Sequence, residues 1–421
     1  MLAAQVTSPR PTRFRSYNCP VSRQPDGSGP DALTSLLLLP PEQQAARGLV
    51  HTPREIHQQP GTWAETFRRL RSIDSSLAQI LAECGVVPKA PTAPDVILAG
   101  AGTSDYIGRS LQRLLQRSWG CNVNSIPSTD LLTGLAQIIV PDRQYVMISF
   151  SRSGDSSEGV AVLSLALERF PQQIRHIVIT CNEAGQMGRM PGVFPLVLAD
   201  AVNDRSLAMT SSFTNMVIAG QYLAFLGSSV SYEPILEALV AIGRSSLGRA
   251  ATLTAKLAKN DYTRVCFLGS GALHGVAQEA ALKVLELNAG RIATLSETFL
   301  GLRHGPMSFI DEQTLVCAFL SGDRRTRRYE LDLLEEIRNK GLAKDLLVVT
   351  PSRHEVQHLT GDVLNLEPPP EFPDDCRPPL DVIVGQLLAL FLCIQNGIRP
   401  DTPSTGAISR VVSHVKIYSP D

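Results

Sequence analysis

Short apolar runs alternate with amphipathic segments along most of the chain after Pro94. In the first half, the runs that we expect to form strands cover residues 95–99, 145–150, 176–180 and 195–198. The second half repeats the pattern at residues 264–268, 314–319, 345–349 and 363–366. Continuous apolar runs indicate strands that are buried on both faces, as in a parallel sheet that helices cover.

The spacing of these runs indicates an internal duplication. The Gly-x-Gly sequence at 100–102 recurs 169 residues later at 269–271, and the next two strand pairs keep the same offset. The alternative is that an ordinary α/β protein offers similar runs by chance. We predict two tandem strand–helix domains of about 165 residues each.

The residues before the first strand divide into two parts. Residues 1–50 are rich in Pro, Ser, Gly and Arg without a sustained period, which predicts a disordered tail with only residues 36–39 docking locally. From Thr52 onward, capping residues and apolar positions at helical spacing predict helices. We therefore expect four parts: the tail 1–50, a helical segment 51–92, a first domain 93–240, and a second domain 241–421 that includes the C-terminal segment.

The composition narrows the classes of function. Among 421 residues, 39 Lys and Arg oppose 40 Asp and Glu, and only 5% are aromatic, which argues against nucleic acid or membrane as a partner. A hydrophobic share of 43% suits a large globular core. Eight scattered cysteines, no apolar stretch of roughly 18 residues and no secretory signal favour a cytoplasmic protein.

Two loops after predicted strands could hold a phosphate group. In the first, Gly102, Thr103 and Ser104 combine a tight turn with hydroxyls at the start of an amphipathic helix. The chain has no Walker A lysine, and Asp105 stands where a dinucleotide-binding fingerprint has its third glycine. Nucleotide binding is therefore not indicated.

The second loop carries three serines: Ser151, Ser153 and Ser156. They follow the predicted strand 145–150, so hydroxyls and free backbone amides gather at one strand end. Neutral donors beside a helix N-terminus suit a phosphate monoester, and ligands of open parallel sheets bind at the carboxyl ends of the strands. The alternative is a flexible serine-rich turn.

Candidate acid–base groups lie mainly in the second half. Glu279, Lys283 and Glu286 share one helix face at i, i+4 and i+7, where ordinary surface ion pairs are the alternative. His304 lies in a loop bounded by glycine and proline, where it could act near pH 7 or simply donate to a loop carbonyl. Asp204 precedes an apolar stretch, where it could line a site or cap a helix.

The sequence His354-Glu-Val-Gln-His358 matches the HExxH pattern of zinc proteases. Leu364 stands where a metzincin has its third histidine, and the segment directly follows a predicted strand. We therefore expect a short outer helix here rather than a metal site.

Several motifs together resemble one family. The segment 151–156 resembles the Ser-x-Ser-Gly-x-Ser/Thr signature of SIS (sugar isomerase) domains, and 100–104 resembles the first loop of that family. The resemblance covers residues 53–419 and narrows to the AgaS-type branch of tagatose-6-phosphate ketose/aldose isomerases and galactosamine-6-phosphate deaminases. Four further segments look like that branch: 179–185, 204–212, 281–287 and 301–306.

This resemblance implies roles for the candidate residues. Glu286 matches the enolisation base of the related isomerase domain of glucosamine-6-phosphate synthase, and Lys283 matches a lysine of the same site. His304 would open the sugar ring in the site of a neighbouring subunit, and Asp204 would line the pocket. Those relatives also carry a C-terminal lysine near the substrate, whereas this chain has Arg410 in that region.

We therefore expect a tandem duplication of a flavodoxin-like, three-layer α/β/α SIS domain with an N-terminal helical segment. The implied reaction converts D-galactosamine 6-phosphate to tagatose 6-phosphate and ammonia, without a metal or organic cofactor. The implied assembly is a homodimer or higher homo-oligomer with a shared site. The residues expected to hold the phosphate are Gly102, Thr103, Ser104, Ser151, Ser153 and Ser156.

Other functions stay open at this stage. Plain isomerisation of tagatose 6-phosphate is the first alternative. A non-catalytic sugar-phosphate sensor is the second, although the first 50 residues show no helix-turn-helix pattern. Glutamine-dependent amino transfer is not expected, because the 90 residues before the repeat are too few for a glutaminase domain.

Overall fold

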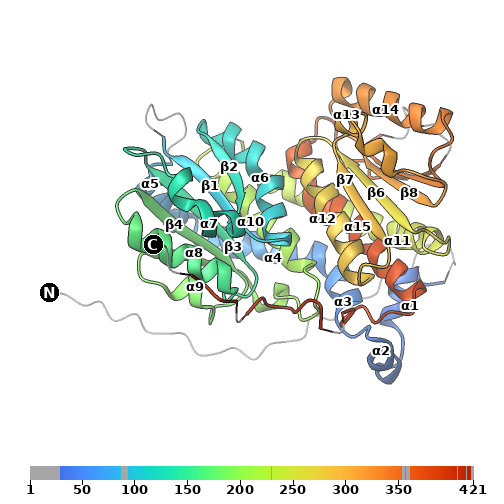
Figure 1. The fold of residues 1–421 in the computed structure, drawn as a ribbon, viewed down its shortest axis with the longest axis horizontal. Coiled ribbons are helices and arrows are strands. Elements are labelled where there is room, and N and C mark those ends of the chain that lie inside the picture. The colour runs from blue at the N-terminus through green and yellow to red at the C-terminus, as the bar shows by residue number, and fades with distance from the viewer. Residues whose placement is uncertain are drawn as a thin grey trace.

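Two parallel sheets of five strands each dominate the computed structural model, which describes residues 29–86, 93–228, 230–352, 356, 361–404, 406–413 and 415–418. Their strand orders are β2-β1-β3-β4-β5 and β7-β6-β8-β9-β10 (Figure 1). Both follow the same doubly wound order, in which the first strand lies between the second and the third. The predicted flavodoxin-like duplication is confirmed.

Eight of the ten strands were predicted, and the two that were not are β2 and β7. The first sheet contains β1 (Asp95–Gly100), β2 (Val123–Pro127), β3 (Tyr145–Ser151), β4 (Ile174–Thr180) and β5 (Val193–Val197). The second contains β6 (Arg264–Gly269), β7 (Ala293–Glu297), β8 (Thr314–Phe319), β9 (Asp345–Thr350) and β10 (Asp362–Asn365). Both β2 and β7 lie at sheet edges, where polar residues interrupt the apolar run that marks an internal strand.

One face of each sheet contributes to a core that the two repeats share. The helices of this layer are α6 (Thr103–Trp119), α10 (Ser211–Phe225), α11 (Glu233–Leu257), α12 (Ala272–Leu287) and α15 (Pro378–Gln395). Phe150 of the first sheet and Phe319 of the second belong to the same buried apolar cluster. Because α6 packs directly on α12 at the centre of the molecule (Figure 1), the two repeats meet along these helices.

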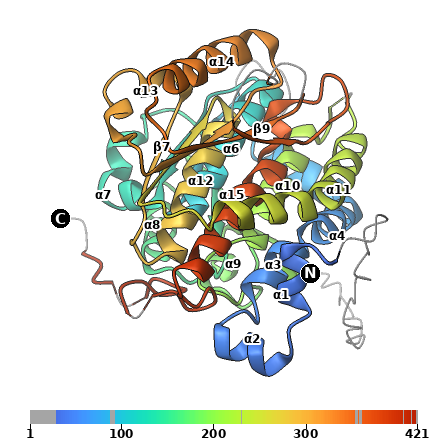
Figure 2. The same cartoon turned by 90° about the vertical axis from the view of Figure 1, so that its right-hand side faces the viewer.

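The opposite face of each sheet has a smaller core of its own. On the first sheet, α7 (Ser128–Ile138) and α8 (Ser157–Arg169) pack apolar side chains against β1 and β3. On the second, α13 (Phe299–Leu302) and α14 (Arg324–Asn339) do the same (Figure 2). The remaining short helices are α9 (Gln186–Arg189), η1 (Asp200–Val202), η2 (Pro306–Phe309) and η4 (Asp374–Cys376).

The N-terminal region is more ordered than its composition suggests. The predicted helical segment contains α3 (Thr52–His57), α4 (Gln59–Ser72) and α5 (Asp74–Glu83). The prediction of a disordered tail is wrong for residues 29–50, which form α1 (Ala32–Leu37) and α2 (Pro41–Arg47). Leu33 and Leu49 are 0% and 1% exposed, so burial in the shared core orders this segment. Residues 1–28 lie outside the described part of the chain.

The long helices α11 and α15 concern two expectations from the sequence: the domain boundary at residue 240 and the lack of a membrane span. α11 runs unbroken through residue 240, so the domain boundary expected there falls inside a helix. α15 has the length and mean hydropathy, 1.6, of a membrane span, but 89% of it is buried inside the protein, as in a core helix. The HExxH segment lies outside the described residues except for Val356.

Candidate active site

The loops after β1 and β3 leave the first sheet side by side, because these two strands pair in parallel. A Cβ atom at Gly100 would lie 2.4 Å from the backbone carbon of Ser104, and Gly102 has a φ of 55°. Only glycine permits this close, left-handed turn into α6. The turn starts α6 at the same edge of the sheet from which the serine loop at 151–156 leaves β3.

Hydroxyl groups organise the serine loop. The Ser151 hydroxyl accepts a hydrogen bond from the Gly154 amide at 3.0 Å, and the Ser153 hydroxyl accepts one from Asp155 at 3.2 Å. Ser151 is buried, whereas Ser153 and Ser156 are half-buried. Ser156 occupies the N-cap position of α8 but makes no side-chain capping bond. The loop therefore offers neutral hydroxyl groups and a helix N-terminus, which suits a phosphate. Its one carboxylate, that of Asp155, accepts a hydrogen bond from the Gln186 amide at 2.8 Å.

The C-terminal segment rests on this loop. The Val412 carbonyl accepts a hydrogen bond from the Ser157 amide at 3.1 Å, and the Arg152 guanidinium donates to the carbonyl of Arg410. The side chain of Arg410 in turn donates to the carbonyl of Asp204 at 2.8 Å. The side chain of Arg410 is thus held by the loop before α10.

α12 brings acid–base groups of the second repeat to the first loop of the first repeat. Lys283 Nζ donates to the Thr103 hydroxyl at 2.9 Å and pairs with the carboxylate of Glu286. Glu279 Oε1 lies 3.3 Å from the same ammonium and 3.4 Å from the Thr103 hydroxyl. The side chains of Lys283 and Glu279 are fully buried, whereas that of Glu286 is 21% exposed.

Burial and charge give these groups different protonation behaviour. Burial raises the pKa of Glu279 to about 8, although the Lys283 ammonium counteracts part of the rise. Burial acts to lower the pKa of Lys283, but the carboxylates of Glu279 and Glu286 outweigh it and the pKa is raised. Lys283 therefore stays an ammonium near neutral pH. Glu286 is the carboxylate of this face that a ligand from solvent can reach.

Sequence reasoning named Glu279 only as a neighbour of Lys283 on the helix face. In the structure it is buried between the repeats, and its Oε2 has no hydrogen-bonding partner. One signal in the sequence could have identified it. Apolar residues surround it along α12, including Ala277, Ala280 and Ala281, so a carboxylate there has no solvated face to occupy.

His304 lies apart from this cluster. It is exposed in the turn between α13 and η2, and its backbone amide donates to the Gly301 carbonyl at 2.9 Å. Among the described residues, no hydrogen bond or ion pair joins its side chain to Lys283 or Glu286. An exposed position is what a residue offered to another subunit would have, and its role stays a prediction.

Asp204 has the contacts of a helix cap. Its two carboxylate oxygens accept hydrogen bonds from the backbone amides of Thr210, Ser211 and Ser212, at 2.8, 3.0 and 2.9 Å. Its exposed fraction is 1%. These contacts match the capping alternative, because they satisfy free amides at the start of α10. A place for Asp204 in the substrate pocket stays a prediction.

A resident metal is not indicated by the geometry of the side chains. Within the described ranges, no group of three or more His, Cys, Asp or Glu side chains is arranged to hold a metal ion. The polar groups that the described site contributes include the Glu286 carboxylate, the Lys283 ammonium and the Thr103 hydroxyl.

The chain is similar to known proteins along most of its length. The SIS domain model matches residues 92–226. D-galactosamine-6-phosphate deaminase AgaS from Escherichia coli is 34% identical over 87% of this chain and 95% of its own length. The enzyme of that name from Shewanella sp. (strain ANA-3) is 34% identical over 91% and 96%. The crystal structure of tagatose-6-phosphate ketose/aldose isomerase from Escherichia coli matches with a TM-score of 0.76 and 33% identity, covering 84% of this chain and 95% of that one.

Proposed function

The chain belongs to the SIS domain family, and we propose that it converts D-galactosamine 6-phosphate to tagatose 6-phosphate and ammonia in the cytoplasm. The observation that supports this most is the hydrogen bond between Lys283 and Thr103. It holds the acid–base face of α12 at the edge of the first sheet where the serine loop emerges. The relatives named D-galactosamine-6-phosphate deaminase supply the substrate class.

The phosphate group would bind to the serine loop and to the first turn of α6. The hydroxyls of Ser151, Ser153 and Ser156 would donate to its oxygens, together with backbone amides of the 102–104 turn. The Ser157 amide, which donates to the Val412 carbonyl, is a further donor if the C-terminal segment moves aside. The phosphate would thus place the far end of the sugar, C1 and C2, toward α12.

Glu286 would act as the base that moves a proton from C2 to C1 of the open-chain sugar. Removing the C2 proton gives a C1–C2 enaminol, and returning a proton to C1 leaves an imine at C2. Water then adds to the imine, and ammonia leaves as the C2 ketone forms. The Lys283 ammonium would stabilise negative charge that develops on the sugar oxygens, and Glu279 holds that ammonium in place.

His304 would open the sugar ring across a subunit boundary, so we propose a homodimer with shared sites. Mixing Glu286→Gln protomers with His304→Asn protomers tests this directly. Half of the randomly formed dimers would be mixed, and each would contain one site with both groups intact. We expect about a quarter of the wild-type activity from such a mixture. Mixed dimers of confirmed composition that remain inactive would place His304 in its own chain's site.

Isomerisation without deamination is the second candidate, and the structural neighbour named tagatose-6-phosphate ketose/aldose isomerase favours it. Both reactions need the same proton transfer and differ in whether C2 carries nitrogen or oxygen. Purified protein should be assayed with galactosamine 6-phosphate, glucosamine 6-phosphate and tagatose 6-phosphate, while ammonia is measured. Ammonia release from galactosamine 6-phosphate supports deamination. Turnover of tagatose 6-phosphate alone would assign the isomerase, and no turnover of any of the three would leave only the sugar-phosphate sensor.

A further inference from the structure

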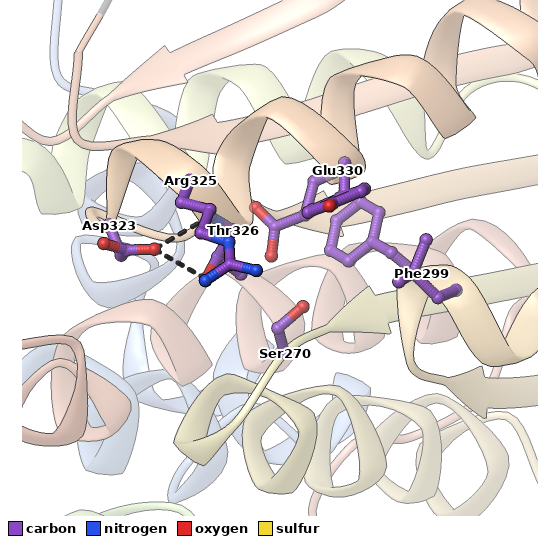
Figure 3. A pocket seen from close by; sticks show the side chains of 8 residues that line it. Ser270, Phe299, Asp323, Arg325, Thr326 and Glu330 are labelled. Atoms are coloured by element: carbon purple, nitrogen blue, oxygen red, sulfur yellow. Dashed lines mark hydrogen bonds between the residues drawn. The ribbon is translucent and has the colours of Figure 1, made fainter.

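The second repeat has its own pocket at the position that corresponds to the phosphate loops of the first. It lies between the end of β6 and the start of α14, with a volume of about 490 Å³, and α13 covers one side. Figure 3 shows Ser270, Phe299, Thr326 and Glu330 around it. The loops after β6 and β8 form it, just as the loops after β1 and β3 form the proposed active site. No role has yet been assigned to this pocket.

Glu330 is a buried carboxyl group whose hydrogen-bonding capacity is only half used. It is 1% exposed, and its Oε2 accepts the Ser321 amide at 2.7 Å. Oε1 has no hydrogen-bonding partner, and the Ser270 hydroxyl is close enough to lower the pKa of Glu330, against the larger rise that burial causes. The carboxyl group lies between Ser270 and Thr326 in the pocket (Figure 3). A buried acceptor without a partner is costly, so a ligand hydroxyl that reached Oε1 would be bound favourably.

Carboxylates already accept hydrogen bonds from the backbone amides that a phosphate would need. Asp323 accepts the Thr326 amide at 2.8 Å and so caps α14, while Asp374 accepts the Gly322 amide at 2.8 Å. A phosphate in this pocket would meet the Asp323 carboxylate and the carboxyl group of Glu330, with Arg325 as the cation in the lining. Like charges at this range repel strongly in a partly buried site. The pocket of the second repeat is therefore unsuited to a phosphate, the group that the loops of the first repeat are proposed to hold.

We propose that this pocket binds a non-phosphorylated sugar. The hydroxyl of Ser270 and the free oxygen of Glu330 would hydrogen-bond to sugar hydroxyls, while Phe299, which is 1% exposed, forms part of the apolar lining. The rim has further apolar area, since Leu300 and Tyr329 are 45% and 48% exposed. Apolar walls with a few converging polar groups are typical of small-molecule sites, and the volume lies in their usual range.

The experiment measures binding of D-galactose, D-glucose and inorganic phosphate to the full-length protein by isothermal titration calorimetry. We expect one of the sugars to bind to the wild type with a Kd of about 1 mM, and phosphate not to compete with it. Glu330→Gln keeps an oxygen for the Ser321 amide and turns an NH₂ group into the pocket. It should weaken sugar binding about tenfold. Leu300→Trp, at an exposed position on the rim, should weaken it by narrowing the entrance.

A matched control separates this site from the proposed active site. The double variant Ser151→Ala, Ser153→Ala should impair phosphosugar turnover and leave sugar binding unchanged. Glu330→Gln should weaken sugar binding and leave phosphosugar turnover unchanged. Absence of sugar binding to the wild type at tens of millimolar would overturn the proposal. So would binding that survives both Glu330→Gln and Leu300→Trp, or competition by inorganic phosphate. Failure of the enzymatic assay alone would leave this inference intact, because different residues carry it.

Discussion

The two repeats share one topology but differ in how they satisfy the amides at the ends of their strands. In the first repeat, the hydroxyls of Ser151 and Ser153 accept the loop amides, and no side chain caps α8. In the second, carboxylates take these places, with Asp323 capping α14 and Asp374 accepting the Gly322 amide. In the first repeat the loop's own carboxylate, that of Asp155, instead accepts the Gln186 amide. The proposed phosphate site therefore lies in the first repeat, where no carboxylate accepts the amides of the serine loop.

The central helices α6 and α12 also differ, and here it is the second repeat that carries the acid–base groups. α6 and α12 start with the same glycine turn, since Gly102 and Gly271 have φ values of 55° and 63°. At positions 169 residues apart, however, α6 carries Ser110, Leu114 and Arg117 where α12 carries Glu279, Lys283 and Glu286. Duplication thus preserved the backbone while each repeat kept a different half of the chemistry. In the proposed site the two halves meet at the hydrogen bond between Lys283 and Thr103.

The largest expected effect comes from the base on α12. Glu286→Gln removes proton acceptance without changing the shape of the side chain, so kcat should fall by a factor of ~10²–10⁴. The control is Arg117→Gln at the matching position of α6, where the side chain is 66% exposed and pairs with Asp375. It should leave kcat unchanged. Equal losses in both variants, measured as ammonia release, would refute this division of chemistry between the helices.

The next effect concerns the anion-binding loops. Ser151→Ala and Ser153→Ala should each raise KM about 10- to 100-fold with little change in kcat, because donors to a non-reacting phosphate act equally in ground and transition states. Ser321→Ala, in the corresponding loop of the second repeat, should leave KM unchanged. A rise in KM for Ser321→Ala as large as for the first-repeat serines would show that phosphate binds elsewhere.

A smaller effect should appear in the pH dependence of stability. Burial raises the pKa of Glu330 from its ordinary value of 4.5 to about 7. The folded protein therefore keeps a proton that the unfolded chain releases, and stability falls as pH rises from about 5 to 7. Glu330→Gln should flatten this decline by about 1–3 kcal/mol, as measured by urea unfolding across that range. An equally steep decline in the variant would assign the pH dependence to other groups.

The smallest effect distinguishes the two helix caps. Asp323→Ala should lower the free energy of unfolding by about 1 kcal/mol, because it removes a capping hydrogen bond to the Thr326 amide. Ser156→Ala should cost clearly less, since Ser156 makes no capping bond in α8. Urea unfolding of both variants without ligand makes the comparison. A larger loss for Ser156→Ala would mean that the first repeat also depends on a side-chain cap.

Local patterns in the sequence predicted the features that depend on neighbouring residues. Continuous apolar runs identified the internal strands, and spacing placed Lys283 and Glu286 on one face of a helix. The edge strands β2 and β7 were missed because polar residues interrupt their apolar runs. The edge strands β5 and β10 carry short apolar runs and were predicted. The ordered segment at 29–50 was missed for a related reason, since its order depends on a distant partner. The Val50 amide donates to the Asp401 carboxylate at 2.7 Å, a contact across 351 positions.

The site was only partly predictable from the sequence, because its residues meet through contacts between distant parts of the chain. Spacing along α12 could not show that Thr103, 180 positions away, faces Lys283. Nor could it show that the carboxylate of Glu279 is fully buried at the junction of the repeats. The carboxyl groups of Asp374 and Glu330 became visible only from tertiary contacts, because they reach the loop after β8 from other elements.

The central claim is that Glu286, on a helix of the second repeat, removes the C2 proton of a sugar whose phosphate is bound by the first. The most direct measurement is exchange of the C2 hydrogen of galactosamine 6-phosphate with solvent deuterium, followed by NMR. This exchange reports proton removal even when ammonia release is slow. The wild type should exchange the C2 hydrogen, and Glu286→Gln should not, although it still binds the substrate. A Glu286→Gln variant that exchanges the C2 hydrogen at the wild-type rate would contradict the account.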